Sequence, residues 1–237
     1  MAIVCKQCSD PLPVAAAVGA LVTCAFCDAT QSLPREVTQA SGRPFSALDF
    51  RTSEMPGWRG TKHCTYQFGG APPALRARFE TDIGTRLYTA LKTQGVFDDV
   101  DAAVSISFQE GDPGDAKRVG IRAGVALRTE VGSQHCYIVN ITNDGYYRVG
   151  KIITVDGAFK FKTVLKWTRS GALDPTWGST NRLRVVADGD RLQIYLNDQL
   201  ATSLRDDSHQ QGLIELVVNP AGSPCEVWFS DLRLAHP

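Results

Sequence analysis

The chain has 237 residues, 43% of them hydrophobic, and its 25 Lys and Arg residues equal its 25 Asp and Glu residues in number. This length suits one large all-β domain, which can use about 200 to 250 residues, with a small appendage. Because the net charge is zero, no overall electrostatic field attracts the chain to nucleic acid or to an anionic membrane. The longest apolar run, residues 14–24, is shorter than the roughly 20 residues that cross a bilayer. We therefore expect no membrane-spanning segment.

The N-terminal residues and the cysteines predict a cytoplasmic protein. Residues 1–6 lack the basic and uninterrupted apolar regions of a secretory signal. The seven cysteines also fit a reducing compartment, because closely spaced thiols tend to form disulfides in an oxidising one. Three of them, Cys64, Cys136 and Cys225, lie outside the N-terminal motif, and we expect the last two to be buried thiols.

Four cysteines near the N-terminus form the most specific chemical motif of the sequence. They make two CxxC pairs, Cys5 with Cys8 and Cys24 with Cys27. The spacing of the pairs is typical of four thiolates that bind one zinc ion tetrahedrally. Four thiolates close the coordination sphere, so the motif predicts a structural zinc and not a catalytic one. The alternatives are two redox-active CxxC motifs or buried thiols.

Residues 1–33 are therefore predicted to form a zinc ribbon, and residues 34–44 a polar, turn-rich linker. A ribbon this short cannot bury a core, so metal binding would supply its folding free energy, roughly 10 to 16 kcal/mol in zinc peptides. The basic residues up to position 43 are balanced by acidic ones. A role in nucleic-acid binding is therefore disfavoured, because that role needs a basic surface.

Residues 45–237 are predicted to form one all-β domain. Apolar and polar residues alternate in short runs, and turn residues separate the runs. The clearest predicted strands are residues 75–80, 104–108, 121–127, 182–187, 191–197, 212–218 and 225–234. Asp188-Gly189-Asp190 stands between two of these runs and predicts a tight hairpin.

One segment fits two different periods. Apolar residues recur every four positions from Leu75 to Leu91 and could form the apolar face of a helix. The same segment begins with a strict two-residue alternation, and Gly84 interrupts its middle. We therefore expect strands here and no helix.

Several motifs follow one another along the β domain. They are Asp49-Phe50, Gly57-Trp58, residues 97–100, 123–128, 137–141 and 144–147, Trp167, and residues 181–185, 194–198 and 227–234. Their order, from Leu48 to Leu234, resembles the concanavalin A-like lectin and glucanase superfamily, particularly its bacterial laminin-G-like and DUF1080-like branches. The resemblance implies an antiparallel two-sheet jelly-roll sandwich whose sheets pack face to face.

The resemblance implies a ligand-binding fold without identifying the ligand. Members of this superfamily mostly bind glycans or proteins, and some hydrolyse glycosides. A retaining glycosidase needs two carboxylates about 5 Å apart, which the superfamily supplies in an ExDxxE pattern. This sequence has no such pattern. Its nearest approach to one, Glu80 with Asp82, is interpreted as a solvated strand end.

Asp98, Asp99 and Asp101 form an acidic cluster just before the predicted strand at Val104. Carboxylates in such a cluster could ligate calcium, as in some lectin-like sandwiches. They could also cap the turn that precedes the strand, and we favour that interpretation.

Aromatic residues near turns are the candidates for ligand contact. Tyr146, Tyr147 and Trp177 lie there, and an exposed ring could stack on a sugar or anchor a protein partner. Trp177 is the one we expect to be exposed, the alternative being a ring folded back over the edge of the sandwich. Trp167 and Trp228 lie in alternating runs and are expected in the core.

Together these features predict a zinc-containing, non-catalytic recognition module that binds a glycan or a protein partner. The second hypothesis is a structural subunit or adaptor of a larger cytoplasmic assembly, with the ribbon as its docking piece. The third is a saccharide hydrolase.

Overall fold

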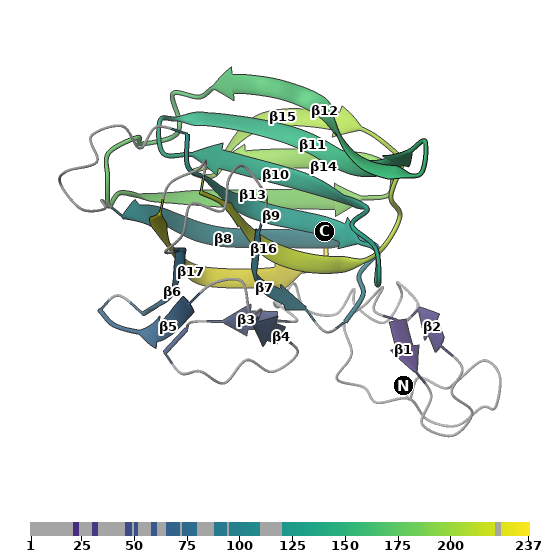
Figure 1. The fold of residues 1–237 in the computed structure, drawn as a ribbon, viewed down its shortest axis with the longest axis horizontal. Coiled ribbons are helices and arrows are strands. Elements are labelled where there is room, and N and C mark those ends of the chain that lie inside the picture. Colours follow the sequence, from purple (N-terminus) through teal and green to yellow (C-terminus); the bar gives the residue numbers. More distant parts are fainter. Residues whose placement is uncertain are drawn as a thin grey trace.

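A computed structural model shows that the chain is all-β wherever it is described. The described residues are 21–23, 30–32, 46–48, 50–51, 58–60, 65–71, 73–79, 88–93, 95–109, 120–220 and 224–237. They form two large antiparallel sheets, stacked face to face (Figure 1), and a small sheet of β1 (Leu21–Thr23) and β2 (Thr30–Ser32). No helix in this part of the chain is long and apolar enough to cross a membrane.

The first large sheet has seven strands. They are β4 (Trp58–Gly60), β7 (Tyr88–Thr93), β9 (Arg122–Thr129), β10 (Cys136–Thr142), β11 (Tyr146–Val155), β12 (Ala158–Arg169) and β16 (Leu213–Asn219). Their order in space is β12-β11-β10-β9-β16-β7-β4, so β12 is one edge of the sheet. β12, β11, β10 and β9 lie next to one another in Figure 1.

The second large sheet lies behind the first in Figure 1. Its strands are β5 (Thr65–Gly69), β6 (Ala74–Phe79), β8 (Val100–Gln109), β13 (Thr180–Asp188), β14 (Arg191–Leu196), β15 (Gln199–Arg205) and β17 (Cys225–Ala235). Their order is β15-β14-β13-β8-β17-β6-β5, and the short strand β3 (Ser46–Leu48) pairs with the last part of β17.

The hydrophobic core lies between the two sheets, because alternate residues of each strand point inward. On β10, the inward residues are Tyr137, Val139 and Ile141. Tyr137 is the largest of the fully buried side chains. We call the opposite side of the seven-stranded sheet, which faces away from this core, the outward face.

Two-residue turns set the register of three hairpins. Gly189 has a φ of 54° in the turn between β13 and β14, and Asn197 and Asp198 have φ of 47° and 64° between β14 and β15. Asp156 and Gly157, with φ of 54° and 75°, join β11 to β12. Consecutive left-handed residues are typical of type I′ turns, whose twist matches that of the strands they join.

The predicted fold class is confirmed for the described residues. Every clearly predicted strand is present, as is the hairpin at Gly189. The ambiguous segment contributes the strands β6 and β7, and residues 80–87 between them lie outside the described residues. The division of the chain into ribbon, linker and sandwich remains a prediction, because most of residues 1–45 also lie outside them.

Candidate functional site

The aromatic residues predicted for ligand contact occupy three different environments. The expectation for Tyr147 is wrong, because its ring is buried in the core and its hydroxyl donates to the Ala201 carbonyl at 3.2 Å. Trp177 is partly buried and packs against the core, so the alternative of a ring folded over the sandwich edge describes it better. Tyr146 is half-buried and lies on the outward face.

The carboxylates of Asp98, Asp99 and Asp101 are hydrogen-bonded to groups of the protein itself. Asp99 is buried, and its carboxylate accepts hydrogen bonds from the Gly189 amide at 2.8 Å and from Arg128 at 3.3 Å. Asp101 forms two hydrogen bonds with the Arg184 guanidinium, at 2.8 and 2.7 Å. Asp98 Oδ1 accepts from the Asp99 amide at 2.7 Å, as a turn-capping carboxylate does. Within the described residues, no group of three His, Cys, Asp or Glu side chains could hold a metal ion.

Two further predicted sites lie outside the described residues. The first is the predicted zinc site, which consists of Cys5, Cys8, Cys24 and Cys27. Its nearest described neighbours are β1, which ends directly before Cys24, and β2, which begins shortly after Cys27. The second is the predicted carboxylate pair of Glu80 and Asp82.

Three large apolar rings of β12 are exposed to solvent. Phe159, Phe161 and Trp167 have exposed fractions of 50%, 40% and 37%. Phe161 is opposite Ile152 and Phe159 is opposite Thr154 in the register with β11, and these positions alternate with core-facing ones. The rings therefore lie in a row along the outward face. Exposed aromatic side chains gathered in this way mark an interaction surface.

Arg148 of β11 connects two of these rings. Its guanidinium carbon lies 4.3 Å from the centroid of Phe161 and 4.5 Å from that of Trp167. Arg122 of β9 lies over Trp167 at 5.4 Å. Gly150 makes room for this arrangement, because a Cβ atom there would stand 2.0 Å from the Phe161 ring. These cation–π contacts hold the rings and the guanidinium groups in one layer.

The environment lowers the pKa of the Arg148 guanidinium without removing its charge. Burial is the main cause and the neighbouring charge of Arg122 is the second, and together they lower the pKa to about 10. Arg148 therefore remains a cation at neutral pH.

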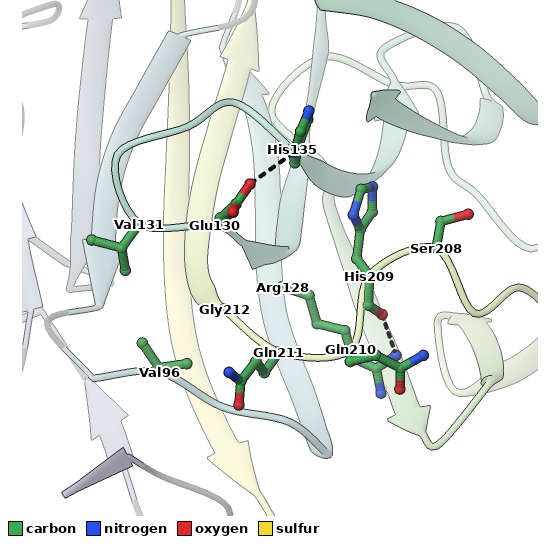
Figure 2. Close-up of a pocket in the computed structure, with 10 residues that line it drawn as sticks. All are labelled: Val96, Arg128, Glu130, Val131, His135, Ser208, His209, Gln210, Gln211 and Gly212. Carbon is green, nitrogen blue, oxygen red and sulfur yellow. Dashed lines mark hydrogen bonds and ion pairs between the residues drawn. The ribbon is translucent and has the colours of Figure 1, made fainter. Parts of the chain in front are cut away.

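A polar pocket of about 490 Å³ opens at one end of the seven-stranded sheet (Figure 2). It is lined by Val96, by the end of β9 and the turn that follows it, from Arg128 to His135, and by the segment from Ser208 to Gly212. In Figure 2 the side chains of Glu130, His135 and His209 stand around its upper part.

His135 joins the pocket to the aromatic row. Its Nδ1 lies 2.7 Å from a Glu130 carboxylate oxygen and its Nε2 lies 2.8 Å from the Thr154 hydroxyl. The imidazole also stacks on His209 at 6.0 Å and meets the edge of Phe159 at 5.5 Å. Pocket and aromatic row therefore form one continuous surface.

Buried polar contacts hold the floor of the pocket. Arg128 is almost fully buried, and its guanidinium donates to the carbonyls of His209 and Asp98, both at 2.9 Å. The Tyr137 hydroxyl donates to Asp206 at 2.6 Å. Burial and this hydrogen bond raise the pKa of Tyr137 to about 12. These groups stay in one ionisation state near neutral pH and fix the segment that carries His209.

Two of the sequence predictions about aromatic residues are therefore corrected. Trp167 was expected in the core but is exposed, because β12 is an edge strand whose apolar rings face outward. Trp228 is half-buried outside the core cluster, under the Arg76 guanidinium at 4.4 Å. The signal for the aromatic row was present in the alternation of Phe159 and Phe161 with lysines.

Sequence comparisons find no relative of this chain. No family model matches it, and no curated protein is detectably similar to it in sequence.

Comparison of folds finds many similar solved structures. The carbohydrate-binding module CBM66 from Bacillus subtilis has a TM-score of 0.56 at 19% identity, over 76% of this chain and 95% of that one. The β-glucanase of Bacillus licheniformis has a TM-score of 0.58 at 12% identity, over 84% and 100% of the two chains. A GH16 protein of Bacteroides ovatus, in complex with a glucan product, has a TM-score of 0.57 at 9% identity, over 80% and 99%.

These similarities define the class of fold. At such low identities they show the fold alone. The described chain is an all-β, jelly-roll-like sandwich, and its fold is similar to that of these proteins. The predicted sandwich fold is therefore confirmed, and the zinc ribbon remains a prediction.

We predict that His209 titrates below the usual imidazole value of 6.5. Burial is the main cause of its lowered pKa, and the neighbouring His135 is the second. The unfolded chain therefore binds this proton more readily, so the free energy of unfolding decreases as the pH falls through about 6.5 and levels off below the folded-state pKa. NMR titration of the imidazole signals measures this value.

The variant His135→Gln is the control for the electrostatic contribution. It removes the neighbouring imidazole, so the pKa of His209 should rise towards 6.5. A His209 pKa at or above 6.5 in the unmodified protein would contradict the described environment.

Proposed function

We propose that the chain is a non-catalytic recognition module that binds a glycan along the outward face of the seven-stranded sheet. The observation that carries this proposal is the row of exposed rings on β12, Phe159, Phe161 and Trp167, which is continuous with the pocket at His135. A row of rings along one strand suits an extended ligand more than a compact one.

The chemistry of this surface matches that of a saccharide. A sugar ring has an apolar face that packs on an aromatic ring and hydroxyl groups that need hydrogen-bond partners. Phe161 and Trp167 offer the first, and the pocket offers the second through the carboxylate of Glu130 and the amide of Gln210. A protein partner would need a larger apolar area than these three rings on one edge strand provide.

Fold neighbours add support of a general kind. One is named as a carbohydrate-binding module, and another was solved with a glucan product. These are properties of those proteins, and the fold alone does not transfer them. The argument for this chain therefore depends on its own residues.

The distribution of carboxylates favours recognition over hydrolysis. Glycoside hydrolysis uses two carboxyl groups on either side of the scissile bond. Among the seven described strands of the sheet, Glu215 is the sole carboxylate, and it accepts a hydrogen bond from Thr89 at 2.7 Å. One acid on this sheet supports a binding role.

We predict that Trp167→Ala and Phe161→Ala each weaken glycan binding about tenfold or more. The reason is that aromatic side chains buried by a ligand typically contribute the largest share of the binding free energy, and truncating one costs more than ~1 kcal/mol. A glycan array identifies a bound saccharide, and isothermal titration calorimetry then compares the variants.

Leu200→Ala is the matched control, because Leu200 is an equally exposed apolar residue on β15 of the other sheet. Its affinity should equal that of the unmodified protein. If Leu200→Ala weakened binding and Trp167→Ala did not, the ligand would lie on the other sheet and the proposal would fail. Measured turnover of the bound saccharide would also overturn the non-catalytic assignment.

We further propose that the four N-terminal cysteines bind one structural zinc ion in the cytoplasm. Four thiolates are the donor set that zinc prefers in closed sites. The two large sheets are built from strands that begin at Ser46 or later, so the sandwich should not need the metal.

We expect one zinc per chain by metal analysis, and its loss on substituting Cys24 and Cys27 with serine. Thermal unfolding of the sandwich should change little in this variant, because the metal would stabilise only the N-terminal region. A metal-free protein purified under reducing conditions would contradict the zinc assignment and leave the glycan proposal untouched.

A further inference from the structure

Two arginines of the outward face lack a carboxylate partner. Arg122 and Arg148 form no ion pair within the described part of the chain. Asp144 is near enough to oppose the lowering of the Arg122 pKa, but burial outweighs it. The charge of Arg122 in turn helps to lower the pKa of Arg148. Two like charges are therefore close together without a counter-charge in contact.

Two arginines of the eight-stranded sheet are arranged differently. Arg184 is bound by both oxygens of Asp101, at 2.8 and 2.7 Å. Arg205 is bound by both oxygens of Asp190, at 2.9 Å each. These positive charges are neutralised within the chain, whereas those of the outward face are available to a ligand.

Asn140 adds an unmet hydrogen-bonding group at the same place. It lies on β10, opposite Arg148 on one side and Gly124 on the other. Its side chain is fully buried, yet neither Nδ2 nor Oδ1 has a hydrogen-bond partner. The Nε of Arg148 is also buried and without a partner.

Unmet polar atoms of this kind are costly. A buried donor or acceptor without a partner costs about 1–3 kcal/mol, and native proteins leave few of them. The Asn140 amide and the Arg148 Nε therefore lack hydrogen bonds at the place where the charges of Arg122 and Arg148 have no counter-charge among the described residues. A bound anion accepts hydrogen bonds, so it would satisfy the donors Asn140 Nδ2 and Arg148 Nε and balance the two charges. The acceptor Asn140 Oδ1 would need a donor, such as a hydroxyl of the saccharide.

We propose that Arg148, Arg122 and Asn140 bind the anionic group of an acidic saccharide, a carboxylate or a sulfate. This inference rests on the proposed glycan-binding function and specifies its substrate class. The planar guanidinium of Arg148 can donate two parallel hydrogen bonds to such a group. The Asn140 amide donates a further one once the ligand draws the arginine side chain aside. The adjacent rings of Phe161 and Trp167 pack on the sugar.

An array of paired acidic and neutral saccharides tests this inference. It contains galacturonan and its methyl ester, and a sulfated galactan and its desulfated form. We expect the acidic member of at least one pair to bind about tenfold more tightly than the neutral one, and the preference to weaken with added salt. The pair that shows the preference distinguishes a carboxylate from a sulfate.

Three variants identify the residues responsible. Arg148→Gln should bring the affinity for the acidic saccharide down to that for its neutral counterpart, and Arg148→Lys should retain part of the preference. Circular dichroism checks that Arg148→Gln keeps the fold. If it does not, Arg122→Gln removes the other positive charge independently. Arg205→Gln on the other sheet is the matched control and should keep the full preference.

The outcomes separate this inference from the proposed function. Equal binding of acidic and neutral saccharides would overturn the inference and leave glycan recognition standing. A preference that persists in both Arg148→Gln and Arg122→Gln would place the anion elsewhere and also overturn it. Binding of no saccharide at all would overturn the proposed function and, with it, the inference.

Discussion

The outward face of the seven-stranded sheet depends on the register between β11 and β12. Because side chains alternate along a strand, a shift by one residue would turn Phe159 and Phe161 towards the core. The two left-handed residues Asp156 and Gly157 set the start of this register, and Gly150 leaves the space that Phe161 needs. β-Bulges further along the pair, between Gly150 and Tyr147, adjust the register so that Trp167 also lies on the outward face. Every later property of the surface follows from this arrangement.

The surface combines three kinds of chemistry along one edge of the sandwich. Exposed rings offer apolar contact, the pocket near His135 offers hydrogen bonds, and Arg148 with Arg122 offers positive charge. The net charge of the chain is zero, so this charge acts locally and does not attract polyanions over long distances. The surface therefore recognises its ligand at short range. The buried ion pair of Arg128 and Asp99 holds the floor of the pocket in place.

Much of the fold could be predicted from the sequence, and less of the site. Strands such as β8 and β14 have one face in the core, so strict alternation identified them. The exposed row of rings on β12 was not predicted, because a two-residue period does not say which face of a strand meets solvent. For the same reason Trp167 was expected in the core and Tyr147 at the surface. The unmet hydrogen bonds of Asn140 depend on its neighbours in space, which no local pattern reveals.

The central claim is that the ligand lies on the outward face, and NMR observation of the tryptophan side chains tests it most directly. Trp167 lies on this face and Trp228 on β17 of the other sheet. On titration with a bound saccharide, the indole N–H signal of Trp167 should shift with ligand concentration, while that of Trp228 stays in place. A shift of the Trp228 signal with none at Trp167 would contradict the account.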